Sequence, residues 1–418
     1  MTPAPRARWL TTLAGALALA ACSATPTAKP NPTPAPPLGS ATPSRVAVAT
    51  PVASASASPS PSPSPTCVEQ TYAALTPDQR LGQLVMVALG KGAPAASLRP
   101  TTEGSHVGNV VYLGGWSSGI QDVTATSALL QKQATPAATG GVGMLIAADQ
   151  EGGKVQQLKG DFTTMPSAVT QGTWSAETLQ KRAGEWSTQL KGAGVNVNFA
   201  PVADTVPEEL GTGNGPIGRW QRQFGATPAA VSTSVTAFVR GTTGAKVVAT
   251  VKHFPGIGRI RGNTDYVTSG LDDTVMTVDD PYLQPFVDGW HAGGPMVMVM
   301  VSSATYPKVD PDNPAMFSPA IVDGLLRSKL GFTGVAITDD IDAASVKAVP
   351  VADRATRFVG AGGDILLTGD TPSAPALVDA LRTASAGDAG FAKRVETSVK
   401  RVLTLKQAMG LLPSCPAP

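Results

Sequence analysis

Eight short apolar runs recur along the chain, and most of them are separated by segments with helical periodicity. Such runs are typical of strands that are buried on both faces of a parallel sheet. Strands that alternate with helices predict an α/β fold, and eight of them predict a TIM-like (β/α)8 barrel. An open, doubly wound sheet is the alternative, although no Gly-x-Gly-x-x-Gly motif follows the first run to support a dinucleotide fold. The runs cover residues 84–89, 107–113, 144–148, 195–202, 247–251, 296–301, 335–338 and 365–367, and the helical segments cover residues 177–193, 228–240, 280–292, 318–329, 374–384 and 391–409.

Polar side chains follow most of these runs at the point where each strand is expected to end. In a barrel of this type, functional groups lie at the carboxyl ends of the strands. The sequence therefore predicts one polar pocket at that end of the barrel. The residues in question are Asp149, Asp204, Lys252, His253, Ser302, Ser303, Asp339, Asp340 and Asp370.

The pair Lys252 and His253 stands out among them because it directly follows the apolar run 247–251. Lys and His are unfavourable at the buried end of a strand unless a polar partner needs them. The glycine-rich loop 256–265 comes next and can bend over a polar ligand. The alternative is an ordinary surface loop after a buried, hydrogen-bonded histidine.

Asp339 follows the apolar run 335–338 without any intervening residue. A carboxylate at the end of a strand is held rigidly, which a nucleophile requires. Asp340 is expected to point elsewhere because alternate side chains of a strand face opposite sides. The alternative is that Asp339 caps the helix that follows.

Five motifs together resemble glycoside hydrolase family 3, and most closely its single-barrel β-N-acetylhexosaminidases. They extend over about residues 75–409 and occur in the order of the family. They are Asp-Gln-Glu-Gly-Gly at 149–153, Asn-Phe-Ala-Pro-Val at 198–202, Arg-Gln-Phe-Gly at 222–225, Lys-His-Phe-Pro-Gly at 252–256 and Gly-Val-Ala-Ile-Thr-Asp-Asp at 334–340.

The resemblance implies a retaining hydrolase that releases terminal β-linked N-acetylglucosamine, commonly from peptidoglycan fragments. It implies Asp339 as the nucleophile. It also implies that Asp149, Arg222, Lys252 and His253 bind the sugar, and that the reaction uses no metal and no organic cofactor.

The loop 257–265 departs from the family pattern. Similar enzymes read His-Gly near its start and Asp-Ser-His or Asp-Thr-His at its end, where the last His is the general acid/base and the Asp orients it. Here Asn263 stands at the position of that Asp and Asp265 at the position of that His. None of the three histidines of the chain lies in this loop.

We therefore expect Asp265 to be the acid/base, positioned by Asn263 or Thr264. A carboxyl group can donate and accept the proton if its pKa is raised, as in most glycosidases. Burial under a closing loop raises such a pKa, whereas Arg259 or Arg261 nearby would oppose the rise. Some relatives with the His are thought to be phosphorylases; an anionic Asp265 would repel phosphate, so water is the expected acceptor.

Two alternative functions remain at this point. The missing dyad is also compatible with a catalytically weak or silent cell-surface lipoprotein that binds sugars. No single motif identifies recognition of the acetamido group, so a β-glucosidase of the same family is the other alternative. Trp220, close to Arg222 in sequence, is the best candidate for stacking on a sugar ring.

The N-terminal residues are typical of an exported lipoprotein. Residues 1–22 carry arginines, then an apolar run that ends Leu-Ala-Ala-Cys, so Cys22 is the expected lipidation site. An ordinary signal peptide with a chance cysteine is the alternative. Residues 23–66 form a Pro-, Ser-, Thr- and Ala-rich linker that cannot build a core. The barrel then occupies residues 67–418, anchored to the outer face of the bacterial membrane or within the cell wall.

The remaining cysteines, Cys67 and Cys415, flank the folded region. In an exported protein we expect them to form a disulfide, and two free thiols at frayed ends are the alternative. No Cys/His cluster has metal-binding spacing. The net charge is only +2, and no basic stripe with interleaved aromatic residues suggests nucleic acid as a partner. The expected partners are a carbohydrate substrate and, through Cys22, a membrane; a monomer is expected.

Overall fold

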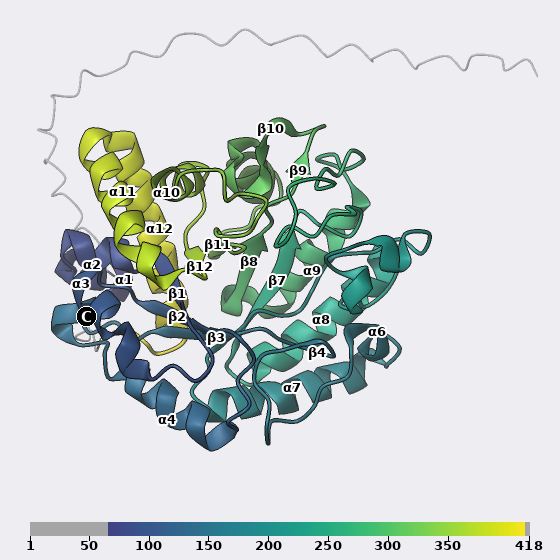
Figure 1. Cartoon of the computed structure of the whole chain (residues 1–418), viewed down its shortest axis with the longest axis horizontal. Coiled ribbons are helices and arrows are strands. Elements are labelled where there is room, and N and C mark those ends of the chain that lie inside the picture. The colour runs from purple at the N-terminus through teal and green to yellow at the C-terminus, as the bar shows by residue number, and fades with distance from the viewer. Residues whose placement is uncertain (1–65, 414–418) are drawn as a thin grey trace, which may run out of the picture. The chain divides into compact units, whose positions relative to one another are not determined.

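Eight parallel strands form a closed barrel in the computed structural model, which describes residues 66–413 (Figure 1). Neighbouring strands pair in the order β11-β8-β7-β6-β3-β2-β1-β12, and Ile337 of β11 pairs with Ile365 just before β12, which closes the ring. The predicted TIM-like (β/α)8 barrel is confirmed. The strands are β1 (Val85–Leu89), β2 (Asn109–Tyr112), β3 (Leu145–Ala148), β6 (Val197–Asn198), β7 (Val248–Phe254), β8 (Val297–Val301), β11 (Ala336–Thr338) and β12 (Leu366–Thr368).

Each of these strands corresponds to one predicted apolar run, and every residue in them is buried. Two strand ends differ from prediction by three residues or more, those of β7 and β6. β7 continues through Lys252 and His253 to Phe254, because both polar side chains find buried partners. β6 is shorter than the run 195–202, which contains Pro201, and a proline cannot donate to the ladder. Met298 and Met300 of β8 are buried in the core.

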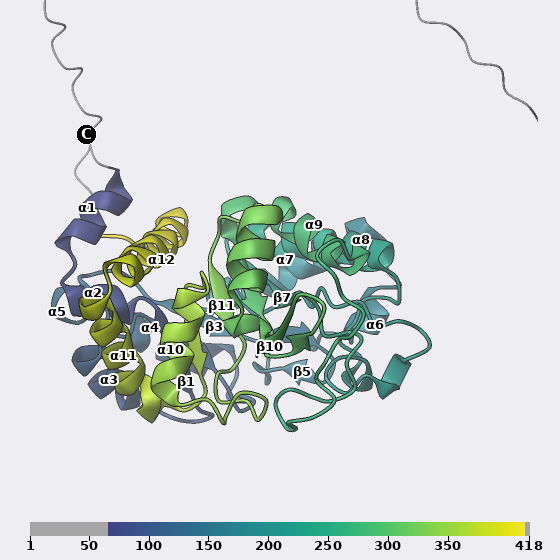
Figure 2. The same cartoon turned by 90° about the horizontal axis from the view of Figure 1, so that it is seen from above.

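The helices surround the barrel and pack against their neighbours in sequence: α7 lies against α8, α8 against α9, and α11 against α12 (Figures 1 and 2). Serine or threonine hydroxyls begin α7 and α8 by accepting backbone N–H bonds. The predicted helical segments are all present. The longer elements are α4 (Ile120–Gln131), α7 (Ala176–Gly192), α8 (Pro228–Gly244), α9 (Gln284–Gly293), the π-helix η7 (Ala320–Lys329), α10 (Val351–Gly360), α11 (Ala374–Gly387) and α12 (Ala389–Ala408).

Short hairpins and helices lie outside the barrel strands. Two small antiparallel hairpins, β4–β5 and β9–β10, follow β3 and β8 respectively. They are β4 (Gln150–Gly152), β5 (Val155–Gln156), β9 (Thr305–Tyr306) and β10 (Asp310–Pro314), and the short helices are α1 (Cys67–Ala74), α2 (Pro77–Gly82), α3 (Arg99–Gly104), α5 (Pro136–Thr139) and α6 (Ala168–Gln171).

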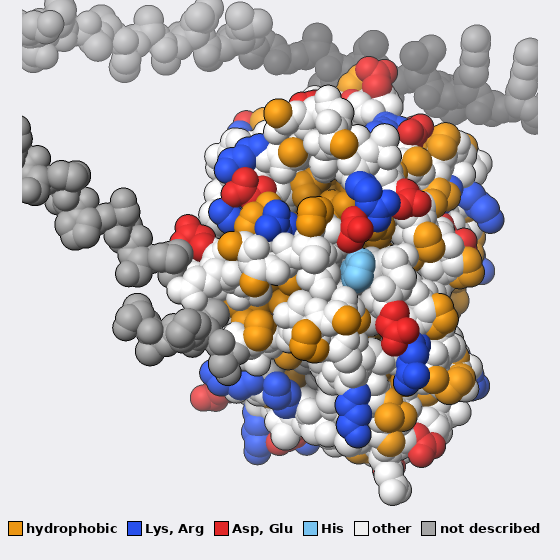
Figure 3. Space-filling model, turned by 90° about the vertical axis from the view of Figure 1, so that its left-hand side faces the viewer, with side chains coloured by type: hydrophobic (Ala, Val, Ile, Leu, Met, Phe, Trp, Pro, Cys, Tyr) orange, Lys and Arg blue, Asp and Glu red, His pale blue; other side chains and the backbone are white. Residues whose placement is uncertain are grey.

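Several predictions concern residues beyond these bounds. The signal segment 1–22 with Cys22, nearly all of the linker 23–66, and Cys415 lie outside the described residues. Cys67 begins α1 and is disulfide-bonded; its pairing with Cys415 stays a prediction. No helix within residues 66–413 has the length and hydropathy needed to cross a bilayer. Figure 3 shows the side of the molecule on the left of Figure 1, where basic, acidic and hydrophobic side chains are interspersed.

One buried lysine makes stability depend on pH. Lys406 of α12 is fully buried and donates to Gln83 Oε1 (2.6 Å) and to the Gly108 carbonyl (3.0 Å). Burial lowers its pKa from the usual 10.5 to about 7. Between these two values the unfolded chain binds more protons than the folded chain, so the free energy of unfolding rises with pH.

We expect the Lys406→Met variant to lose that part of the pH dependence, up to about 1.4 kcal/mol per pH unit between pH 7 and 10. Urea unfolding at pH 7 and pH 9 measures the slope for both proteins. Lys393→Met, which removes an exposed lysine from the same helix, is the control and keeps the slope. Equal slopes in wild type and Lys406→Met would contradict the assignment.

Candidate active site

The carboxyl ends of β3, β7 and β11 bring most of the predicted site residues together. Lys252 Nζ lies 2.5 Å from Asp149 Oδ1 and 2.6 Å from Glu151 Oε1. Lys252 is only 1% exposed. Its burial lowers its pKa, but the charges of Asp149 and Glu151 outweigh that effect, and the net shift is upward. Lys252 is therefore a charged ammonium held between two carboxylates.

Arg222 reaches the same cluster from the segment after β6. Its Nε and Nη2 bond the two oxygens of Glu151 at 2.9 and 2.7 Å, a bidentate pair. Burial alone would raise the pKa of Glu151, but Arg222 and Lys252 hold it at about 2. Glu151 lies in a recognised motif, yet sequence reasoning gave it no role. Its position two residues after Asp149, at the same end of β3, could have indicated that it joins the site.

His253 lies behind Arg222 with both ring nitrogens engaged. Nδ1 is 2.7 Å from Asp204 Oδ2, and Nε2 is 3.3 Å from Arg222 Nη2. Burial first, and then the charges of Arg222 and Lys252, keep the pKa of His253 well below its usual value. The ring is therefore neutral. The hydrogen-bond network assigns the proton to Nδ1, which donates to Asp204.

Asp204 is the buried end of this chain of contacts. Its carboxylate also accepts the backbone N–H groups of His253 (3.1 Å) and Ile257 (2.7 Å). Burial raises its pKa to about 8, and these two amides oppose the rise. Asp204 thus fixes the start of the loop that follows β7, a role that its place after the fourth run only hinted at.

Asp339 follows β11 directly, as predicted. Its backbone N–H donates to the Val301 carbonyl (2.9 Å), which ties it to β8, and the Asp340 N–H donates to its Oδ1 (3.0 Å). Burial and the nearby charge of Asp265 raise its pKa to about 7. The next helix, α10, begins only at Val351, so Asp339 does not cap it.

The Asp340 carboxylate bonds the backbone around it, although the charge of Asp265 still reaches it. Asp340 Oδ1 accepts the N–H groups of Asp342 and Gly369, which stabilises the turn after β11.

Asp265 lies on the loop after β7 and is exposed as a residue, while it also lines the cavity beside Arg222. Its N–H donates to Asn263 Oδ1 (2.9 Å), so Asn263 does contact it as expected. Its burial in the cavity raises its pKa; Asp149 adds to the rise, and Arg222 and Lys252 oppose it. Asp265 and Asp339 therefore belong to one electrostatic site.

The expectation that Arg259 opposes this rise is wrong. Arg259 Nη1 and Nη2 bond the carboxylate of Asp280 at 2.6 and 2.9 Å, and its guanidinium stacks 3.6 Å from the Tyr282 ring centroid. It anchors the base of the loop instead. The cations that act on Asp265 come from other elements, which loop sequence alone does not reveal.

A cavity of about 300 Å³ opens next to these residues. Trp220 is 36% exposed on its wall, and Lys154 Nζ lies 5.8 Å from its ring centroid. Lys154 therefore lies over one face of the ring, and the exposed part of Trp220 borders the cavity, where a sugar could stack on it. The wall also includes Arg222, Asp265 and Tyr266.

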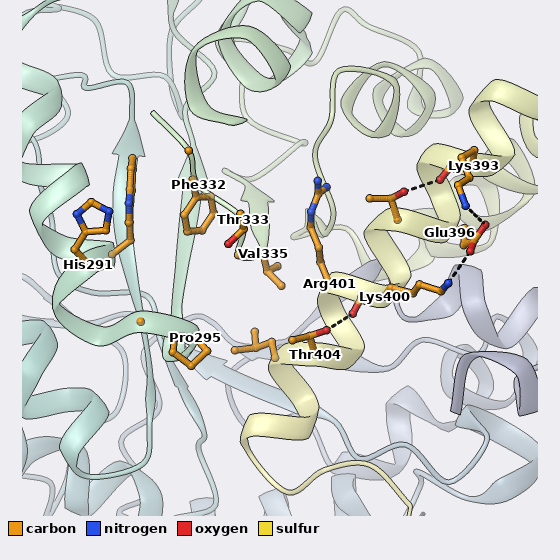
Figure 4. A pocket seen from close by; sticks show the side chains of 16 residues that line it. His291, Pro295, Phe332, Thr333, Val335, Lys393, Glu396, Lys400, Arg401 and Thr404 are labelled. Carbon is orange, nitrogen blue, oxygen red and sulfur yellow. Dashed lines mark hydrogen bonds and ion pairs between the residues drawn. The ribbon is translucent and has the colours of Figure 1, made fainter. Parts of the chain in front are cut away.

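A larger cavity of about 760 Å³ lies at the opposite end of the barrel (Figure 4). Pro295 lies two residues before β8 and Val335 directly before β11, and both line the cavity. Lys400 and Arg401 of α12 line it as well. None of the predicted site residues borders it. In barrels of this type the end at which strands begin serves stability and the opposite end carries the chemistry.

The assembled groups suit a polyhydroxylated ligand next to a pair of coupled carboxyls. Asp149, Arg222 and Lys252 offer acceptors and donors in fixed geometry. Asp339 and Asp265 raise each other's proton affinity, so one of them holds a proton where the other is ionised. Residues 66–413 contain no group of three His, Cys, Asp or Glu side chains arranged to hold a metal ion.

Comparison with known proteins gives a consistent picture. Residues 76–405 match the family model described as glycosyl hydrolase family 3 N terminal domain. The crystal structure of a β-N-acetylhexosaminidase from Beutenbergia cavernae is 41% identical, with a TM-score of 0.77, over 80% of this chain and 99% of that one. A family 3 β-N-acetylglucosaminidase from Paenibacillus is 31% identical, with a TM-score of 0.71, over 82% and 64%.

Among curated sequences, a β-hexosaminidase from Xanthomonas axonopodis is 36% identical over 234 residues. The alignment covers 54% of this chain and 66% of that relative, so the chain spans just under two thirds of its length.

Proposed function

Because the chain belongs to glycosyl hydrolase family 3, we propose that it releases terminal β-linked N-acetylglucosamine with retention of configuration. Its membership confirms the predicted family and enzyme class, a glycoside hydrolase. The observation that carries the proposal is the electrostatic pair Asp339 and Asp265 at the carboxyl end of the barrel. Most retaining glycosidases use two carboxyl groups at the scissile bond, one as the nucleophile and one as the acid/base.

In the first step, the Asp339 carboxylate attacks the anomeric carbon while the Asp265 carboxyl protonates the glycosidic oxygen. The bond between that carbon and the leaving oxygen breaks, and a glycosyl ester with Asp339 forms. In the second step, Asp265 takes a proton from water, water attacks the anomeric carbon, and the ester bond breaks. The raised pKa of the pair keeps the one proton that the first step consumes.

The cluster around Lys252 binds the sugar in this proposal. Arg222 lines the cavity, Lys252 bonds Asp149, and Glu151 holds Arg222 and Lys252 in place. We assign Asp149, Arg222 and Lys252 to the sugar hydroxyls. His253 orients Arg222 through Nε2 and has only 3% exposure, so its part in binding is to support Arg222.

We place the protein on the outer face of the cell membrane, anchored through a lipidated Cys22 that lies outside the described residues. The linker 23–66 would let the barrel reach cell-wall material, which supports peptidoglycan fragments as natural substrates. A Pro-rich chain of this length is extended and keeps a domain at a distance from its anchor.

A silent sugar-binding lipoprotein is the second candidate, and the absent His/Asp dyad favours it. The raised pKa of Asp339 and Asp265 argues against it, because a binder has no use for a proton shared beside a sugar site. A β-glucosidase is separated from the main proposal only by substrate preference.

The proposal is tested with 4-nitrophenyl β-N-acetylglucosaminide, with the matching glucoside as control. We expect turnover of the first at least about tenfold faster, since polar groups built for one substituent are left unpaired by another. Proton NMR should show the β-anomer as the first product. Sugar binding without turnover would support the binder, and faster turnover of the glucoside would support the β-glucosidase.

A further inference from the structure

The loop that starts at the proposed nucleophile also holds the backbone of the proposed acid/base. The N–H of Ser345 donates to the Thr264 carbonyl (3.1 Å), and the N–H of Ala344 lies 3.3 Å from the Asp265 carbonyl. Both acceptors belong to the loop after β7, and both donors belong to the loop after β11. The two carboxyl groups are therefore linked through one short backbone connection.

The side chain of Ser345 fixes this connection to the barrel wall. Its Oγ donates to Ser303 Oγ at 2.7 Å. Ser303 is only 2% exposed and follows β8, which pairs directly with β11. A hydroxyl pair that is largely excluded from water has a well-defined geometry because neither group has solvent as an easy alternative partner.

The loop after β11 is rigid enough to serve as a scaffold. Arg354 of α10 is 5% exposed and donates to Asp342 Oδ1 (2.8 Å) and to the carbonyls of Lys347 (2.9 Å) and Val349 (2.7 Å). The second carboxylate oxygen of Asp342 accepts from Thr368 Oγ1 at the end of β12 (2.6 Å). Three points of this loop are thus tied to α10 and one to the barrel.

The loop that carries Asp265 has the opposite character. Residues 265–270 are all exposed, and Tyr266 is 70% exposed. Such a segment opens easily because few buried contacts oppose its motion. The bonds to Ala344 and Ser345 attach its inner end to the loop after β11, which has more buried anchoring bonds.

We propose that Ser345, held by Ser303, is a positioning residue that sets the place of Asp265 relative to Asp339. The inference rests on the proposed function. A misplacement of about 1 Å can cost about 10²-fold in rate, so this tie affects the step in which Asp265 donates its proton. Loss of the Ser345–Ser303 hydrogen bond should have little effect on a substrate whose leaving group departs without protonation.

The test compares two aryl β-N-acetylglucosaminides in the full chain. Phenol is a poor leaving group and needs the acid, whereas 2,4-dinitrophenol does not. For Ser345→Ala we expect kcat/KM on the phenyl substrate to fall about tenfold, and on the dinitrophenyl substrate less than about twofold. Ser303→Ala removes the other partner of the Ser345–Ser303 hydrogen bond, so it should show the same two changes in kcat/KM. Ser345→Thr keeps the hydroxyl and should restore the phenyl rate.

Two outcomes overturn the inference. One is an equal fall on both substrates, which indicates general damage to the site. The other is an unchanged phenyl rate in Ser345→Ala and Ser303→Ala. Thermal unfolding of each variant shows whether it is folded. A wild type that turns over neither substrate rejects the proposed function itself, which is a separate result.

Discussion

The Asp339→Asn variant should lose at least about 10⁴-fold in kcat on 4-nitrophenyl β-N-acetylglucosaminide, because removal of a covalent nucleophile removes the reaction step itself. Asn fills the same volume and can still accept the N–H bond of Asp340 (3.0 Å), so the turn after β11 should survive. Steady-state kinetics and thermal unfolding of the variant measure the two effects separately. The large loss should therefore appear in kcat and not in stability.

Asp340→Asn is the matched control for this prediction. Its side chain bonds the N–H groups of Asp342 and Gly369, and an amide oxygen can accept both bonds. We expect its kcat to fall by less than about tenfold, far less than for Asp339→Asn, because the amide keeps both bonds and removes only a minor charge that raises the pKa of Asp339. Equal losses in the two variants would show that the turn and not the nucleophile had been tested.

The second large effect is expected for Asp265→Ala. General acid catalysis contributes about 10²- to 10⁴-fold, so kcat/KM on the phenyl substrate should fall by that range and on the dinitrophenyl substrate far less. Azide should raise the dinitrophenyl turnover of this variant and give the β-glycosyl azide, because an anion attacks the glycosyl ester without a base. Asp272→Ala removes an exposed carboxylate from the same segment and should change neither rate.

The pH dependence of kcat/KM follows from the same pair. In the wild type the rate should fall at low pH, where Asp339 is protonated, and at high pH, where the proton donated to the leaving oxygen is lost. Burial and the charge of Asp265 raise the pKa of Asp339 to about 7. Asp265→Ala has no proton to donate and none to lose at high pH, so its basic limb should disappear on the phenyl substrate, while the acidic limb that belongs to Asp339 remains. A basic limb that persists in Asp265→Ala would contradict the assignment of Asp265 as the acid.

The strands of this fold are readable in the sequence because each is an uninterrupted apolar run buried on both faces. Two barrel helices, α4 and α10, escaped prediction. α4 has three Ser or Thr residues in place of a clear apolar stripe, and α10 is a single short segment of ten residues. Weak local patterns of this kind become helices through packing against the barrel.

In the site, too, the sequence indicates where a residue lies relative to its own strand but not which distant segments it contacts. The order of residues placed Asp339 directly after β11 and Lys252 near the carboxyl end of β7. It did not reveal that Glu151 joins Lys252 to Arg222, nor that Arg259 turns away to Asp280. Those facts depend on which segments meet above the barrel, and side-chain spacing along one loop carries no such information.

Covalent labelling of Asp339 tests the central claim most directly. Full-length protein is incubated with a fluorosugar inactivator built on N-acetylglucosamine, then analysed by intact mass and by peptide mapping. We predict one added sugar per chain, located on the peptide that carries Asp339, and no adduct in Asp339→Asn. An adduct on another residue, or no adduct in a wild type that turns over the substrate, would contradict the assignment of Asp339 as the nucleophile.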